Sequence, residues 1–209
     1  MRTRTRLLEA ARARFAQQGP EATTIQDITE AADLGKGTFY RHFADKNDVL
    51  SALVQEALEG LNRRIRGDGQ CSVSLEAALD HLVNAHAAFI RDSSQDFALL
   101  FGGSLALGLA GDCPPDHPLA GYLAEIGQRL RPHLAGLADG PRVRKLAYVL
   151  SQFALGLYAF SLLGLGREEL ERATEPARRS FVAGAAAFLN PTRLAAVEPL
   201  SGQPRPHIV

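Results

Sequence analysis

The sequence has few cysteines, no excess of either charge and no strand-like pattern of any length. Its two cysteines, Cys71 and Cys113, are too few for a disulfide framework among 209 residues. The 23 lysines and arginines equal the 23 aspartates and glutamates, so the chain is not a polyelectrolyte. Residues 1–66 are nevertheless mildly basic, with 11 basic and 9 acidic side chains. Apolar residues make up 46% of the chain, which excludes disorder throughout and predicts a folded protein.

Membrane and secretory segments are not expected. No apolar run follows the arginine-rich first six residues, which argues against a secretory signal and for a cytoplasmic protein. Segment 146–166 carries no charge over 21 positions, close to the length of a membrane span. It contains Ser, Gln and three Gly, and no second span follows. We therefore interpret it as a buried helix and expect no membrane partner.

Apolar residues recur at helical spacing along most of the chain, which predicts an all-α protein. Gly19-Pro20 ends the first helix, and both Thr23 and Thr24 begin capping-box patterns for the second. The tail from Asn190 holds four prolines and no periodicity. About nine helices are expected, over about 3–17, 25–32, 35–43, 45–66, 74–92, 95–109, 119–136, 141–165 and 167–189.

Residues 25–43 have the pattern of a helix-turn-helix motif, two short helices joined by a tight connection. Leu34, Phe39 and Phe43 have the spacing to pack inward, which leaves a cation, a hydroxyl, a glycine and a phenol facing outward. Such a surface suits a DNA major groove, and a glycine permits close approach of the backbone. The same residues would also suit the solvated surface of a small helical bundle, so the pattern alone leaves both interpretations open.

A specific run of residues favours DNA binding. The third helix reads Lys-Gly-Thr-Phe-Tyr-Arg-His-Phe over 36–43, and Asp45-Lys46 follows two residues later. With the run that precedes it from Gly19, this segment closely resembles the N-terminal domain of TetR-family transcriptional regulators, over about residues 5–50. The resemblance implies contacts with the phosphates and the rest of the DNA backbone, and with the groove. The residues so assigned are Thr24 and Lys46 on phosphates, Lys36, Gly37 and Thr38 in the groove, and Tyr40 and His42 on the backbone.

Three positions depart from the pattern of the family that the segment resembles. Asp33 stands where a turn glycine is usual, Gly35 where a Ser or Thr cap is usual, and Thr29 where Ala is usual. Each departure is sterically tolerable, since Asp adopts a left-handed backbone more readily than most residues. Asp33 is the one with a functional consequence, because it adds negative charge near the DNA.

No catalytic motif is found, so we expect neither an enzyme nor a cofactor. His81 and His86 are five residues apart and do not share a helix face. Cys113 and His117 share a loop with two aspartates, but no second ligand pair has the spacing of a zinc site, and no metal is expected. Phosphate-binding and dinucleotide-binding glycine motifs are absent, and so is the nucleophile elbow.

A ligand cavity in the helical body is a weaker expectation. His86 falls on the apolar stripe of the fifth predicted helix, either as a core histidine bonded to a backbone group or as the polar anchor of a cavity. An aromatic and aliphatic lining would suit a small apolar or aromatic effector. The candidate lining residues are His86, Phe89, Phe97, Phe101, Tyr122, Ile126, Gln152 and Phe153.

The last two predicted helices carry small residues that allow close helix approach, beside phenylalanines that supply apolar area. They could form an intrachain core or a four-helix interface between two copies, and the resemblance favours the dimer. The candidate interface residues are Gly156, Phe160, Phe181, Ala183, Gly184 and Ala187.

Together these features predict a helix-turn-helix domain over 1–46, a ligand-binding and dimerisation domain over 47–190 and a proline-rich tail over 191–209. We expect a homodimeric repressor that binds operator DNA and is released by an unknown small effector. The alternative is a helical ligand-binding or membrane-associated protein whose N-terminal bundle is only structural.

Overall fold

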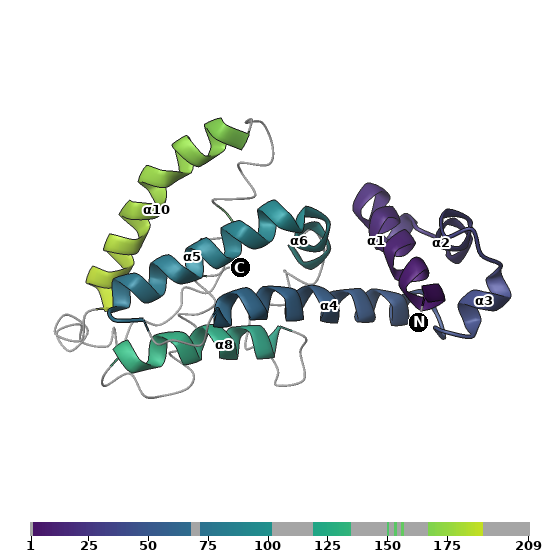
Figure 1. Cartoon of the computed structure of the whole chain (residues 1–209), viewed down its shortest axis with the longest axis horizontal. Coiled ribbons are helices and arrows are strands. Elements are labelled where there is room, and N and C mark those ends of the chain that lie inside the picture. The colour runs from purple at the N-terminus through teal and green to yellow at the C-terminus, as the bar shows by residue number, and fades with distance from the viewer. Residues whose placement is uncertain are drawn as a thin grey trace, which may run out of the picture.

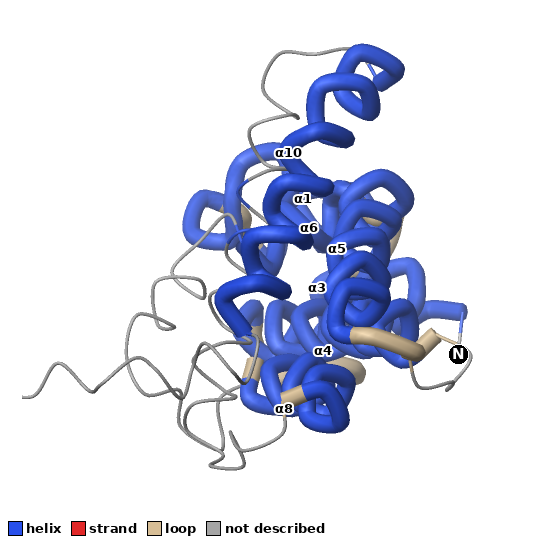
Figure 2. The backbone as a smooth tube through the Cα atoms, turned by 90° about the vertical axis from the view of Figure 1, so that its left-hand side faces the viewer, coloured by secondary structure: helices blue, strands red, loops and turns tan. Residues whose placement is uncertain are grey.

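The computed structural model describes residues 2–67, 72–101, 119–134 and 167–189, with single positions at 150, 153 and 156. These residues form eight α-helices and one 3-10 helix, and no strand occurs among them (Figure 2). The all-α class is therefore confirmed. The elements are α1 (Arg2–Ala22), α2 (Ile25–Ala31), α3 (Lys36–Tyr40), α4 (Lys46–Arg66), α5 (Leu75–Asp92), α6 (Ser94–Phe101), α8 (Ala120–Leu130), η2 (Arg131–His133) and α10 (Arg167–Leu189).

The first three helices and the start of α4 enclose a small core, and this part of the chain is called the head below. Within α1 the backbone breaks at Gly19, whose φ of 81° lies in the left-handed region, so the predicted end of the first helix is found there. A further turn continues through Pro20 to Ala22. The buried apolar residues of the head are Leu7, Leu8, Ala10, Ala11, Phe15, Ile28, Ala32, Phe39, Phe43, Val49 and Leu53.

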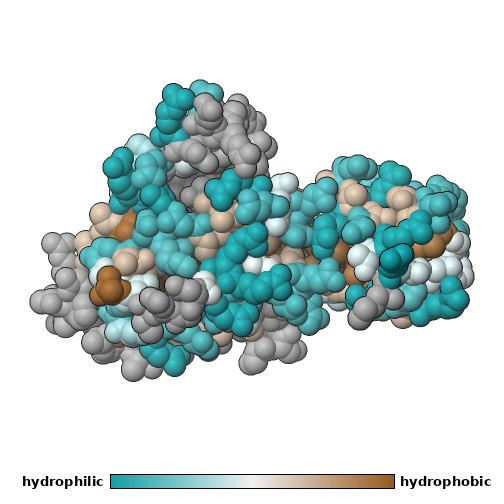
Figure 3. Space-filling model, viewed as in Figure 1, coloured by the Kyte–Doolittle hydropathy of each residue, from teal (hydrophilic) through white to brown (hydrophobic). Residues whose placement is uncertain are grey.

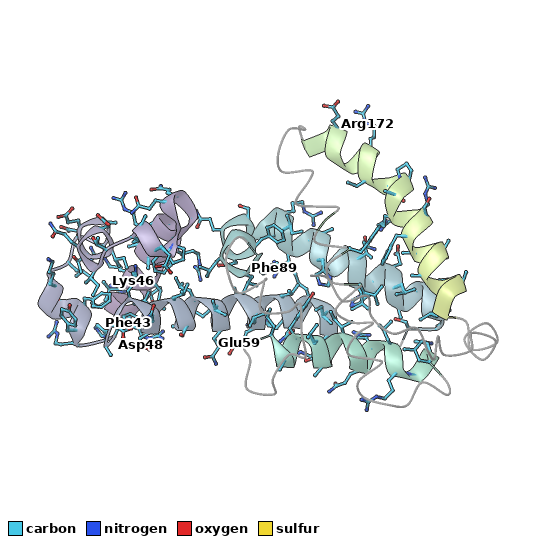
Figure 4. The ribbon with its side chains drawn as sticks, turned by 180° about the vertical axis from the view of Figure 1, so that it is seen from behind. Phe43, Lys46, Asp48, Glu59, Phe89 and Arg172 are labelled. Atoms are coloured by element: carbon cyan, nitrogen blue, oxygen red, sulfur yellow. The ribbon has the colours of Figure 1, made fainter. Side chains whose placement is uncertain are left out.

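A second core lies among α4, α5, α6, α8 and α10, which are called the body. Figure 1 shows α4 leading from the head into the body, where α5 and α8 lie beside its second half. Phe89 of α5 approaches α4 at Gly60, where a Cβ atom would lie 3.8 Å from its ring (Figure 4). Leu50 of α4 and Leu99 of α6 pack against both cores. The head is therefore joined to the body by α4 and also by α6.

The C-terminal end of α4 is held by side chains of two body helices. The Ile65 carbonyl accepts hydrogen bonds from Nε2 of His81, at 2.8 Å, and from Nε of Arg129, at 3.0 Å. Arg129 also donates to the carbonyl of Arg66. Terminal carbonyls of a helix need such partners, and a cation at this end interacts favourably with the helix dipole. The end of α4 away from the head is thus fixed to α5 and α8.

The surface and the helix lengths show whether a described helix could span a membrane. Hydrophilic residues cover most of the coloured surface in Figure 3. Among the helices of the described ranges, none is long and apolar enough to cross a lipid bilayer. Segment 146–166 lies outside the described residues except at 150, 153 and 156, so its buried helix stays a prediction. The predicted domain boundaries also stay predictions, and the tail lies outside the described part.

Candidate nucleic-acid interface

Helix α2 begins with a capping box built by Thr24 and Asp27. The Thr24 hydroxyl accepts from the Asp27 amide at 3.1 Å, and the Asp27 carboxylate accepts from the Thr24 amide at 2.8 Å. Hydrogen bonds from the Thr24 backbone and then from its side chain lower the pKa of Asp27. The neighbouring candidate cap, Thr23, is buried and donates instead to the Gly19 carbonyl at 2.8 Å. The exposed Thr24 therefore orders the start of α2.

The turn between α2 and α3 explains why glycine would be usual at position 33. Asp33 has a φ of 52°, and no other described non-glycine residue has a positive φ. Aspartate tolerates this left-handed conformation better than most residues. Arg6 of α1 braces the turn, because its Nη2 donates to the Ala32 carbonyl at 2.6 Å and lies 3.8 Å from the Asp33 carboxylate. The negative charge of Asp33 therefore has a cation beside it.

Helix α3 is anchored by one buried face and presents the other to solvent. Phe39 is fully buried and contacts Phe43, with ring centroids 5.9 Å apart, as the spacing predicted. On the outer face, Tyr40 is 58% exposed and the Lys36 ammonium donates to the Gln26 side chain at 3.1 Å. Thr38 is half-buried and accepts a hydrogen bond from Arg41 at 3.4 Å. A phenol, a cation and a hydroxyl thus project from a helix only five residues long.

Gly37 has no structural reason to be glycine within the chain itself. Its φ is not in the left-handed region, and a Cβ atom built on it would meet nothing within 4 Å. An alanine would favour the helix, since glycine costs about 1 kcal/mol in a helix interior. A bare backbone on an exposed helix face instead permits close approach by a partner.

Comparisons with known proteins support this interpretation of the head. Residues 7–53 match the family model described as bacterial regulatory proteins, tetR family. These residues are called the tetR-family domain below, after the family model that they match. Over 63 residues, the chain is 41% identical to the HTH-type transcriptional repressor KstR2 of Mycobacterium tuberculosis. That match covers 30% of this chain and 32% of the repressor, so it concerns the tetR-family domain and little of the body.

Solved structures extend the likeness of fold beyond the tetR-family domain. A tetR-family regulatory protein from Rhodococcus RHA1 has a TM-score of 0.65 at 17% identity, covering 91% of this chain and 98% of that one. The regulator FadR from Bacillus subtilis, solved in complex with stearoyl-CoA, has a TM-score of 0.61 at 16% identity. That match covers 88% of this chain and 96% of FadR. The head and body therefore have the arrangement of tetR-family structures.

Lys46 lies within the tetR-family domain, as the first residue of α4 (Figure 4). Asp45 caps this helix by accepting from the Asp48 amide at 2.9 Å. The Lys46 ammonium donates to the carbonyls of Glu21, at 3.2 Å, and Thr23, at 2.9 Å. The side chain thus ties the α1–α2 connection to α4, a positioning role that the sequence pattern did not predict. Its phosphate contact stays a prediction, like those of Thr24 and of the exposed His42.

In the body, His86 is both a bonded core residue and a neighbour of a cavity. Its Nδ1 donates to the Leu82 carbonyl at 2.7 Å, and its Nε2 accepts from the Tyr122 hydroxyl at 2.6 Å. Burial lowers the pKa of His86 to about 4, partly opposed by the bond to Leu82, so the ring is neutral near pH 7. The cavity encloses about 10 Å³, room for about one water molecule, within about 240 Å³ of empty space that includes its open mouth. The described residues that line it are Leu79, Leu82, Val83, His86, Ile126, Leu150 and Phe181.

The other candidate lining residues lie in several places. Phe89 and Phe97 are buried in the body core but do not line this cavity. Phe153 stacks on Phe181 at 3.7 Å between ring centroids and is 37% exposed. The Phe101 side chain and Gln152 lie outside the described part. Sequence reasoning missed Leu150 and Phe181, which meet α5 only through long-range packing that helical periodicity cannot predict.

Helix α10 has one inward face and one outward face. Val182 and Ala186 are buried against the body, whereas Ala183, Gly184 and Ala187 are exposed. Gly156 is also exposed, Phe181 is partly buried, and Phe160 lies outside the described residues. The small outward residues recur at helical spacing, so α10 presents a strip with little side-chain bulk. The dimer interface assigned to this strip stays a prediction.

Proposed function

We propose that this chain is a homodimeric transcriptional regulator that binds operator DNA through α3. The observation that carries the proposal is the outer face of α3, where Lys36, the bare backbone of Gly37 and Tyr40 stand exposed on a helix anchored by Phe39. Such a helix fits a major groove, with cations and hydroxyls on phosphates and base edges. The tetR-family domain and the matched repressor support the same function.

One such helix contacts only a few base pairs, so useful specificity requires two heads on one operator. Half-sites of a two-fold dimer lie roughly one helical turn apart, about 34–36 Å. The exposed strip of Ala183, Gly184 and Ala187 on α10, together with the exposed Gly156, is the surface we assign to the dimer. Small residues at these positions allow helices of two copies to approach closely.

We assign the cavity beside His86 to an uncharged apolar or aromatic effector, or to the apolar part of a larger one, which must separate the lining helices to enter. Its described lining holds no charged residue, and its one titratable side chain is neutral at pH 7. A charged group placed there would lose its hydration without gaining a counter-charge. FadR of Bacillus subtilis, a structural neighbour, was solved with stearoyl-CoA, so saturated acyl-CoA is a reasonable first probe.

Selection from random duplexes followed by fluorescence anisotropy tests the DNA-binding function. The wild type is expected to select a sequence with two-fold symmetry and to bind it about a thousandfold more tightly than a scrambled duplex. Tyr40→Ala and Lys36→Ala should weaken this binding. Arg131→Ala, which removes an exposed cation from the body, should leave it unchanged. Equal, purely salt-dependent binding to every duplex would refute the proposal.

A further inference from the structure

One arginine of the head contacts two different helices beyond its own. Nε of Arg12, on α1, lies 2.7 Å from Oδ1 of Asp96 on α6. Nη2 of the same guanidinium donates to the Glu56 carboxylate on α4 at 3.1 Å. The two carboxylates belong to the helix that leaves the head and to a helix of the body that packs against α1. Arg12 therefore bridges three helices where the head meets the body.

The bridge is better shielded than the other described ion pairs of the head. The side chains of Arg12 and Asp96 are only 25% and 19% exposed, whereas those of Arg6 and Asp33 are 50% and 101% exposed. The facing Arg12 Nε and Asp96 Oδ1 atoms are shut off from solvent, and their alignment is that of a close ion pair rather than of a hydrogen bond. A shielded charge depends strongly on its partner, because removing one member of the pair leaves the other buried without a counter-charge.

The contact supplies a second attachment for the head. Helix α4 runs from the head into the body (Figure 1), and a single connecting helix would allow the head to swing about its end. Beside the bridge, Leu99 of α6 packs against both cores. With α1 held on α6 and the far end of α4 held by His81 and Arg129, the head has a defined angle to the body.

We propose that Arg12 and Asp96 are positioning residues that set the orientation of the DNA-binding head. The proposal rests on the proposed function, since the angle of each head then sets the spacing of the two recognition helices on DNA. An operator whose half-sites have a different spacing binds weakly, because the bridge prevents the heads from changing their angle to the body to reach both half-sites. Asp96 lies in the first turn of α6, directly after α5. A shift of α6 therefore reaches the head through this bridge.

Operators of altered spacing test the proposal. The sequence selected by the wild type is compared with derivatives that carry one base pair more or less between the half-sites, a displacement of about 3.4 Å. The wild type is expected to lose about tenfold or more in affinity for both derivatives. In Asp96→Asn this penalty should fall to about threefold or less. Arg12→Lys, which keeps the charge but loses the fork that spans two carboxylates, should behave similarly.

Asp92→Asn is the matched control. Asp92 lies 3.5 Å from Arg64, in an ion pair between α4 and α5 that lies wholly within the body. This variant should keep the wild-type spacing penalty. The proposal is overturned if Asp96→Asn and Arg12→Lys keep that penalty, or if they weaken binding to all three operators by the same factor, as a merely stabilising pair would. A wild type that selects no operator refutes the proposed function itself, whereas an unchanged penalty in the variants refutes only the bridge.

Discussion

Replacing Gly37 with alanine should stabilise the protein and weaken its binding to DNA. The position is in α3, its backbone is not left-handed, and a Cβ atom would meet nothing within 4 Å in the chain. The methyl group therefore costs no internal clash, and it removes the backbone freedom that glycine has in the unfolded state. The expected gain in unfolding free energy is about 0.5–1 kcal/mol. In a protein of this size, that gain corresponds to a rise in melting temperature of about 1–4 °C.

The same substitution, Gly37→Ala, is expected to lower the affinity for the operator. If the DNA surface approaches the α3 backbone at Gly37, the added methyl group occupies space that the groove needs. Displacing the helix weakens the neighbouring contacts of Lys36 and Tyr40, and a loss of about 1.4 kcal/mol or more, tenfold in affinity, is expected. Thermal unfolding by circular dichroism gives the first effect, and fluorescence anisotropy on the selected operator gives the second.

Gly121→Ala is a matched control for this experiment. Gly121 is an exposed glycine of α8 with nothing within 4 Å of its built Cβ atom, so it should give a similar gain in stability. Gly121 lies in the body, away from the head, so the affinity of the Gly121→Ala variant for the operator should stay at the wild-type value. If Gly37→Ala also kept wild-type operator affinity while gaining stability, the outer face of α3 would not be the DNA-contacting surface.

Three further predictions follow from the head, the cavity and α10. Asp33→Asn keeps a side chain that tolerates the φ of 52° and removes a fully exposed negative charge, so operator affinity should rise a few-fold at low salt; unchanged affinity across a salt titration would show that this charge does not face DNA. Because burial lowers the pKa of His86 to about 4, the unfolded state takes up the proton first, and unfolding free energy should fall by about 3 kcal/mol as pH drops from 6.5 to 4. Urea unfolding at several pH values in this range should show a smaller pH dependence of the unfolding free energy in His86→Gln than in the wild type. An equal pH dependence in the two proteins would contradict the lowered pKa of His86. Ala183→Asp, on the outward face of α10, should yield a monomer by sedimentation without loss of helicity, and a dimer of wild-type affinity would place the interface elsewhere.

Local features of the head could be predicted from the sequence because they depend on neighbouring residues. Thr24 and Asp27 cap α2 within one turn, Gly19 breaks α1, and Phe39 points inward by helical periodicity. The left-handed conformation of Asp33 was also foreseeable, since the turn requires a residue that tolerates it. Such signals span a few residues and depend little on the tertiary fold.

Long-range contacts could not be predicted in the same way. The Arg12–Asp96 pair joins residues far apart in the sequence, and each alone resembles an ordinary charge on the polar face of a helix. The cavity lining could be predicted only in part. The apolar stripe of α5 that contains His86 is visible in the sequence, but the packing of Leu150 and Phe181 around the same cavity is not. Lys46 shows the same limit, since its contacts with two backbone carbonyls exist only once α1 and α4 are packed together.

Hydrogen–deuterium exchange with and without the selected operator tests the central claim most directly, namely that DNA contacts the outer face of α3. The amides of α3 and of the adjoining turn should exchange more slowly in the complex, because DNA covers a short surface helix that opens readily when free. The amides of α8, on the far part of the body, should exchange at the same rate in both states. Protection confined to body helices, with no change over residues 36–42, would contradict the account.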